Sequence, residues 1–101
     1  MTASDRREVT GLRLLPWPGP DGQRCYLSAD EEEGGYLSRL ADDMEEAQLA
    51  TGEEVLAHAV ELLRGPGAMP SGELRFCVRR LSEALRDALR IAESRGGRTA
   101  R

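Results

Sequence analysis

The chain has 101 residues, of which 40% are hydrophobic, 32% are charged and only 4% are aromatic. This composition is typical of one soluble globular domain with an aliphatic core, and it excludes an intrinsically disordered chain and a chain of two domains. The net charge of −4 is unevenly distributed, because residues 1–63 carry 5 Arg and 14 Asp or Glu (net −9), whereas residues 64–101 carry 9 Arg and 4 acidic residues (net +5).

The acidic first part and the basic last part have two interpretations. Opposite charges on neighbouring helices favour their pairing, so the two parts can lie against each other within one fold or between two copies of the chain. Alternatively, the basic part faces an outside partner. The Arg content is weak support for phosphate recognition, because all 14 basic residues are Arg, a bias typical of GC-rich coding sequences such as those of actinobacteria.

Residues 1–7 are polar, and we expect them to form a disordered N-terminus. No apolar run reaches the ~18 residues needed to cross a bilayer, and the N-terminus lacks the apolar stretch of a signal peptide. We therefore expect a cytoplasmic protein without a membrane partner. In a reducing compartment, Cys25 and Cys77 are expected to be free thiols.

Residues 8–28 are predicted to form a β-hairpin. Strand-forming residues fill 8–17, and the returning strand is predicted over 23–28. Between them, proline and Asp21-Gly22 favour a tight reversal of the chain. A two-stranded hairpin alone is marginal in water, so it must pack on a helix or extend the sheet of a second copy, and the sequence leaves both possibilities open.

A helix is predicted over residues 35–64. Gly52 raises the possibility of a break, but a single long helix is favoured because the apolar stripe keeps its face through this glycine. Gly65-Pro66-Gly67 is expected to end the helix. The predicted buried stripe contains Leu37, Leu40, Met44, Ala47, Thr51, Val55, Ala59 and Leu62. The predicted solvated face contains Asp42, Asp43, Glu45, Glu46, Glu53 and Glu54.

A second helix is predicted over residues 71–95, ended by Gly96-Gly97 and followed by a disordered tail over 96–101. Its apolar residues form two adjoining stripes, a face wide enough to contact two neighbouring helices at once. A helix in a four-helix bundle has two such neighbours, whereas a helix in an isolated hairpin has one. The residues expected to form a dimer interface on this face are Leu74, Cys77, Val78, Leu81, Leu85 and Leu89.

Together these elements predict an α+β fold in a single domain, residues 1–101: an N-terminal two-stranded antiparallel β-hairpin followed by a long antiparallel α-helical hairpin. Helices of about 44 and 37 Å would make the monomer elongated. Such a monomer leaves one side of both helices uncovered. A second copy would cover this side, which predicts a dimeric four-helix bundle.

The sequence favours a small acidic, non-catalytic protein–protein interaction or adaptor module that acts as a homodimer. Another protein is the expected partner, and the residues expected to bind it are Trp17, Arg79, Arg80, Arg86 and Arg90. The alternative is a dimeric nucleic-acid-associated regulator that uses the Arg-rich C-terminal helix. A sequence pI of about 5.0 and the lack of helix-turn-helix spacing disfavour nucleic acid as the partner.

Enzymatic activity is not expected. His58 is the only histidine, and the sequence contains neither a GxSxG motif nor a glycine-rich phosphate loop. The acidic run at residues 30–35 lacks the spaced ligands of a calcium loop, and a lone histidine cannot anchor an ordinary zinc site. We therefore expect no catalytic residue, no cofactor and no bound metal.

Overall fold

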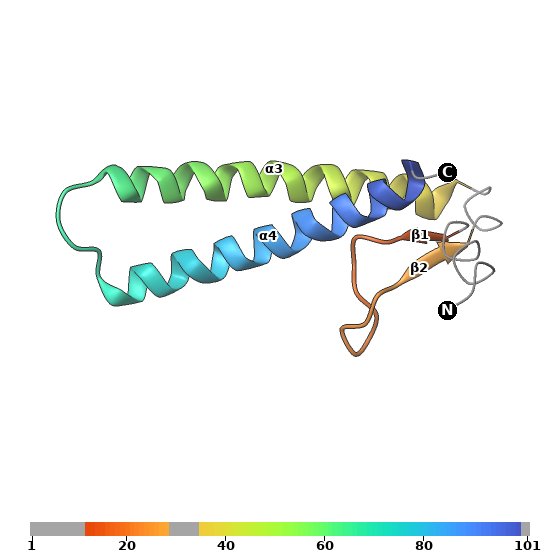
Figure 1. Cartoon of the computed structure of the whole chain (residues 1–101), viewed down its shortest axis with the longest axis horizontal. Helices are drawn as coiled ribbons and strands as arrows, with labels where there is room; N and C mark the ends of the chain where they lie inside the picture. The colour runs from red at the N-terminus through yellow and green to blue at the C-terminus, as the bar shows by residue number, and fades with distance from the viewer. Residues whose placement is uncertain (1–11, 29–34, 100–101) are drawn as a thin grey trace.

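A helical hairpin with a small β-hairpin at its open end makes up the described part of the chain (Figure 1). The computed structural model describes residues 12–28 and 35–99. The elements in chain order are β1 (Leu12–Leu14), β2 (Tyr26–Ser28), α3 (Tyr36–Arg64) and α4 (Ser71–Thr99). The predicted α+β fold, an antiparallel β-hairpin followed by two helices that pack together, is therefore confirmed.

The β-hairpin is shorter than predicted. β1 and β2 pair antiparallel, with Arg13 opposite Leu27, and the pairing is extended by a hydrogen bond from Leu15 N to Cys25 O (2.8 Å). Pro16 then ends the ladder because it has no amide proton to donate. The predicted tight reversal is present, with Gly22 at a φ of +81°. The first residues of the predicted strand and the predicted disordered segment, residues 1–7, lie outside the described residues.

α3 is one continuous helix of 29 residues, so the favoured prediction of an unbroken helix at Gly52 is confirmed. Glycine costs a helix about 1 kcal/mol relative to alanine. At this position it lies where the two helices meet, because a Cβ placed on Gly52 would be 3.8 Å from the Cβ of Ala84. Gly35, at a φ of +85°, directly precedes the helix. The glycine-rich loop after Arg64 ends it, as predicted.

α4 also has 29 residues and extends beyond its predicted end. The prediction that Gly96-Gly97 stops this helix is wrong, because the helix continues through both glycines to Thr99. Each glycine weakens the helix by about 1 kcal/mol, but no proline follows to forbid helical geometry. Arg95 also carries a positive charge near the negative end of the helix dipole. Of the predicted tail, residues 100–101 lie outside the described residues.

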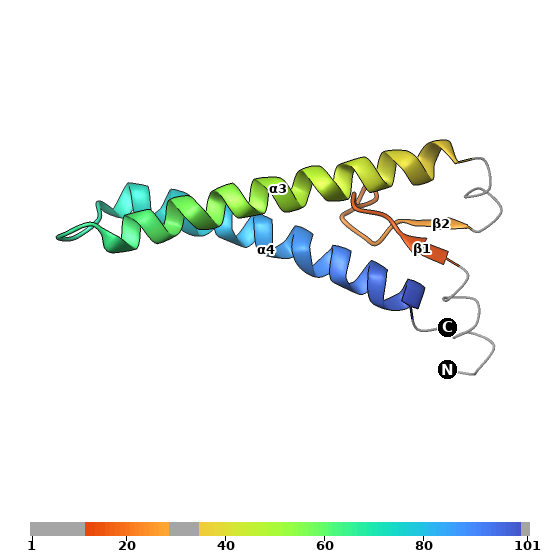
Figure 2. The same ribbon diagram turned by 90° about the horizontal axis from the view of Figure 1, so that it is seen from above.

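The two helices cross: Figure 1 shows them apart at their connecting loop, whereas Figure 2 shows them apart at the other end, where the β-hairpin lies between them. They come close where Gly52 faces Ala84. The radius of gyration is 17.4 Å and the principal extents are 55 × 31 × 27 Å. A globular domain of this length would have a radius of gyration of about 13 Å. The predicted elongated shape is therefore confirmed.

The hydrophobic core is small and lies where the hairpin meets α3. Leu15 and Leu27 of the hairpin are buried against Ala41 of α3, and Trp17 and Cys25 pack around them. This core occupies only the open end of the molecule. Most of the length of the two helices is therefore covered on only one side, by the other helix.

The buried face of α3 is rotated relative to the prediction. Leu37 and Met44, expected in the buried stripe, are both 38% exposed, whereas Ala41, which lay outside that stripe, is buried. Ala59 is buried, as predicted. Glu45, predicted for the solvated face, is only 2% exposed. Small residues at the contact allow two helix axes to approach closely, and the charge of Glu45 is balanced by the arginines described below. These two causes outweigh the hydrophobic pattern on which the prediction depended.

Candidate functional site

One side of the helical hairpin carries large apolar side chains that no other described part of the chain covers. The leucines of α3 recur every seven residues, and the apolar residues of α4 recur at steps of three and four, so each set lies on one side of its helix. All of the following side chains are exposed, and we call the surface that they form the apolar face: Leu49, Leu56, Leu63, Leu74, Val78, Leu85 and Leu89.

A groove between α3 and α4 runs through the middle of the apolar face. Leu49 and Leu56 line it from α3, and Leu81 and Leu85 line it from α4. Glu53 of α3 also lines the groove. No residue of the β-hairpin takes part in the lining. The groove is therefore a surface of the helical hairpin itself, open to a partner along its length.

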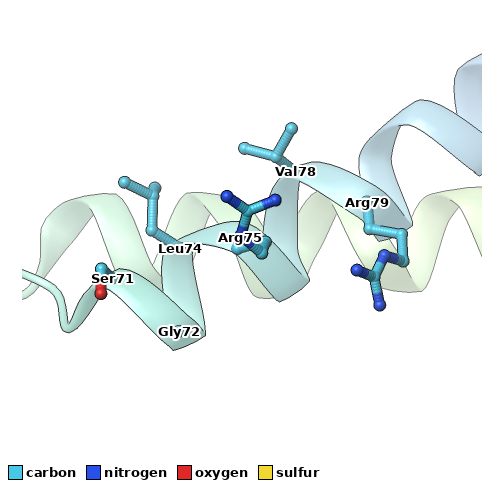
Figure 3. A pocket seen from close by; sticks show the side chains of 6 residues that line it. All are labelled: Ser71, Gly72, Leu74, Arg75, Val78 and Arg79. Carbon is cyan, nitrogen blue, oxygen red and sulfur yellow. The ribbon is translucent and has the colours of Figure 1, made fainter.

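Toward the loop, the apolar face continues along α4. Figure 3 shows Leu74 and Val78 projecting to the same side of this helix, with Arg75 and Arg79 beside them. Every lining residue of this hollow belongs to the first turns of α4. A hollow lined by a single helix has no opposite wall, so this region is an uncovered helix surface rather than an enclosed ligand pocket.

Four of the six residues predicted for the dimer interface lie exposed on the apolar face, namely Leu74, Val78, Leu85 and Leu89. Leu81 is half-buried at the wall of the groove. Cys77 is buried within its own chain, where its neighbours include residues of α3, so it is already covered in a single copy.

Sequence reasoning missed the contribution of α3 to this face. Leu49, Leu56 and Leu63 are seven residues apart, and this spacing was available in the sequence. The longer apolar stripe that includes Leu37 and Met44 competes with this spacing and predicts a different buried face.

The arginines predicted to bind a partner fall into two groups. Arg80 pairs with Glu83 at 2.8 Å, and Arg90 donates a hydrogen bond to Pro16 O at 3.3 Å, so both are occupied within the chain. Arg79 and Arg86 are exposed and take part in no ion pair among the described residues, and the same holds for Arg75. We call the free group, which follows one side of α4, the basic edge: Arg75, Arg79 and Arg86.

The outer side of α3 carries the opposite charge. Its acidic residues take part in no ion pair that the described residues form: Asp43, Glu46, Glu53 and Glu54. The two helices are joined by an ion pair at their open end, where Arg95 Nη2 lies 3.6 Å from Glu45 Oε1. Along most of their length, the opposite charges of α3 and α4 are therefore not matched within one copy.

The β-hairpin is fixed to α3 by a buried arginine. Arg13 of β1 is 4% exposed, and its Nη2 lies 2.6 Å from Asp42 Oδ1 and 3.4 Å from Glu45 Oε2. Its Nη1 donates hydrogen bonds to the carbonyl and hydroxyl oxygens of Ser38, at 3.1 and 2.9 Å. A guanidinium provides the planar set of donors that such a multiple contact needs. Arg13 therefore holds the hairpin in one position on α3.

Backbone carbonyls of the hairpin accept hydrogen bonds from both helices. Ser94 Oγ of α4 donates to Leu14 O at 3.0 Å, and Gln48 Nε2 of α3 donates to Pro16 O at 3.0 Å. Trp17, predicted to bind a partner, is half-buried against the core. The hairpin end of the molecule is thus held together by its own contacts.

At the hairpin tip, an exposed ion pair joins the strands to α4. Arg24 Nη2 lies 2.9 Å from Glu93 Oε1, and this hydrogen bond, together with the charge of Glu93, raises the pKa of Arg24. The side chains of Arg24 and Glu93 are 60% and 50% exposed, so the ion pair contributes little to stability.

Within residues 12–28 and 35–99, the chemically reactive side chains are not gathered into a pocket large enough for a ligand. His58 and Cys77 line the same hollow with Phe76, but its volume is about 160 Å³, below the ~300 Å³ at which ligand pockets usually begin. Cys25 and Cys77 are free thiols, as predicted. Among the described residues, no group of three or more His, Cys, Asp or Glu is placed to hold a metal ion.

Comparisons with protein-family models, curated proteins and solved structures find no match for this chain. None of the helices in the described ranges combines the length and the apolar character needed to cross a membrane.

Proposed function

We propose that the chain is a non-catalytic protein–protein interaction module that acts as a homodimer, in which two helical hairpins form a four-helix bundle through their apolar faces. The observation that carries this proposal is the apolar face itself. It extends along both helices, includes a groove and remains uncovered in a single copy. Monomeric soluble proteins rarely expose apolar surface over such a length without a partner.

The exposed fractions of these side chains indicate a substantial driving force. Leu56, Leu85 and Leu89 are each about 60% exposed. Complete burial of a leucine side chain contributes about 1.5 to 3 kcal/mol, so covering one of these leucines contributes roughly 1 to 2 kcal/mol before ordering costs. In a two-fold dimer each leucine of the apolar face is buried on both copies, so its contribution counts twice. A few such leucines therefore suffice for association at low concentration.

No residue of the β-hairpin lines the groove, but Gly22 and Tyr26 line a separate hollow with Leu89 of the apolar face. The exposed Pro18 and Pro20 line neither the groove nor this hollow, and they would remain free on each copy. The adaptor function that we propose therefore separates two surfaces: the helices bind a second copy, and the hairpin end or the charged helix sides bind another protein.

A nucleic-acid-associated regulator is the second candidate, and the basic edge is the observation that favours it. If these arginines make three phosphate contacts, the affinity for DNA should fall about 40-fold when the salt concentration is raised from 50 to 200 mM. Fluorescence anisotropy with a labelled DNA duplex at the two salt concentrations tests this function. The absence of binding at 50 mM salt would exclude it.

Co-expression of a tagged and an untagged copy tests the proposed homodimer. We expect roughly one untagged copy to be retained for every two tagged copies when the two are expressed equally, because the copies pair at random through the same apolar face. The same experiment with Leu56→Glu and Leu85→Glu in both copies provides the control, since a charge on the apolar face should abolish retention. Retention that survives both substitutions would contradict the proposed interface.

A further inference from the structure

The direction in which the two copies pair follows from the charges of α3 and α4. We infer, on the basis of the proposed homodimer, that both copies point the same way, so that α3 of each packs against α4 of the other. Both loops then lie at one end of the bundle, and both β-hairpins lie at the opposite end.

Two symmetric arrangements of a helical-hairpin dimer are available. A two-fold axis along the bundle places α3 beside α4 of the other copy and keeps both loops at the same end. A two-fold axis across the bundle places α3 beside α3 and α4 beside α4, with the loops at opposite ends. The apolar face alone is compatible with both arrangements, so the choice depends on other properties of the two helices.

The helix charges favour the first arrangement. α3 contains 2 Arg and 7 acidic residues (net −5), and α4 contains 7 Arg and 4 acidic residues (net +3). Pairing like helices would bring two acidic helices together, whereas pairing unlike helices brings opposite charges together. Glu53 lies at the edge of the groove, and the basic edge of α4 takes part in no ion pair within the described part of its own chain.

The heights of the apolar residues along the bundle are compatible with this arrangement. Gly52 of α3 lies level with Ala84 of α4, as shown by the 3.8 Å approach of a Cβ placed on the glycine. Because the helices are antiparallel, equal steps in opposite directions reach equal heights. Leu49, Leu56 and Leu63 then fall within about one residue of three apolar positions of α4, namely Ala88, Leu81 and Leu74.

Same-direction pairing preserves these heights between copies, since an axis along the bundle moves no residue along it. Each leucine of α3 then meets an apolar residue of α4 from the other copy. In the crossed arrangement centred on the apolar face, near Leu56 and Arg80, α4 meets itself in reverse. Val78 and Leu85 would then fall within about one residue of Leu81 and Leu74, and Leu49 of α3 would lie level with Leu63 of the other copy. The heights therefore fit both directions, and the helix charges decide between them.

A distance between the two loops tests the direction. A spin label is placed on Ala68→Cys, in the exposed loop, after Cys25→Ser and Cys77→Ala have removed the native thiols, and Cys77→Val serves as a second background. Same-direction pairing predicts a label-to-label distance within roughly 25 Å, because neighbouring helix axes in a bundle are about 10 Å apart. Crossed pairing predicts at least about 35 Å, because Ala68 lies about 12 residues beyond Leu56 along the axis in each copy.

The outcomes separate the direction from the dimer itself. A short distance in a labelled protein that light scattering shows to be dimeric supports the inference. A dimer with the long distance overturns the direction and leaves the proposed homodimer intact, whereas a folded monomer overturns both. The salt dependence gives a second measurement: the dissociation constant of the dimer should rise several-fold from 50 to 500 mM NaCl, and a fall would indicate pairing of like-charged helices.

Discussion

Leu85→Ala is the substitution that addresses the apolar face most specifically. The side chain is 60% exposed in one copy and lines the groove between the helices. Alanine is the best helix former, so the substitution should leave α4 and the stability of the single copy almost unchanged. Its effect should therefore appear in the association of two copies.

The size of the effect follows from the exposed fraction. Covering the remaining 60% of Leu85 contributes roughly 1 to 2 kcal/mol, and alanine keeps only a small part of that contribution. Each copy therefore loses about 1 kcal/mol of association free energy. Because the substitution is present in both copies of a two-fold dimer, the dimer loses about 2 kcal/mol in total. The dissociation constant should rise about 30-fold, as measured by sedimentation equilibrium.

Phe76→Ala is the matched control, because Phe76 is on the same helix and is 54% exposed, but it lines the hollow with His58 rather than the groove. It should leave the dissociation constant within about twofold of the unsubstituted protein. If Phe76→Ala weakens the dimer and Leu85→Ala does not, the copies associate through the other side of the helices. In that case the reasoning about the apolar face is wrong.

Three further predictions concern the stability of the fold and are checked by urea unfolding. Arg13→Met should lower the free energy of unfolding by about 3 to 5 kcal/mol, because it leaves the buried Glu45 with less compensating charge, whereas Arg24→Ala should have a much smaller effect because its ion pair is exposed; equal effects would contradict this assignment. Ser94→Ala should cost about 1 to 2 kcal/mol, since it leaves the carbonyl of Leu14 without this buried hydrogen bond, and no change would mean that the bond does not hold the hairpin. Gly52→Ala should stabilise the chain by about 0.5 to 1 kcal/mol, because the added methyl group meets Ala84 at an ordinary contact distance, and destabilisation would indicate that the helices pack more closely than described.

The arrangement of the elements could be predicted from local signals in the sequence. Proline and glycine at residues 16–22 and 65–67 mark the turn and the loop, and the three- and four-residue spacing of apolar side chains marks two long helices. The helix lengths then predict an elongated molecule. These signals act over a few residues, so the elements that they predict do not depend on tertiary contacts.

The face of α3 that is buried could not be predicted in the same way. Glu45 is charged, and a charged residue is normally assigned to the solvated side of a helix. Its burial depends on Arg13, 32 residues earlier, and on Arg95, 50 residues later, and no local pattern indicates that these residues meet. These long-range contacts with Glu45 follow only from the tertiary structure, in which the hairpin lies between the two helices at their open end.

The end of α4 and the roles of individual arginines were beyond sequence reasoning for a related reason. Gly96-Gly97 is a usual stop signal, but without a following proline it only weakens the helix. Arg80 and Arg86 each lie three residues from Glu83 in the sequence, yet it is Arg80 that forms the ion pair with Glu83. The apolar positions of α4 were identifiable because their spacing alone shows that they share a side of the helix.

The central claim is that a second copy covers the apolar face, and the mass of the protein in solution tests it most directly. Light scattering coupled to size-exclusion chromatography should give about twice the chain mass of 11.1 kDa at micromolar concentration, with a shift toward the single-chain mass on strong dilution. A mass of one chain that stays constant across this range, for a protein that is folded by circular dichroism, would contradict the claim.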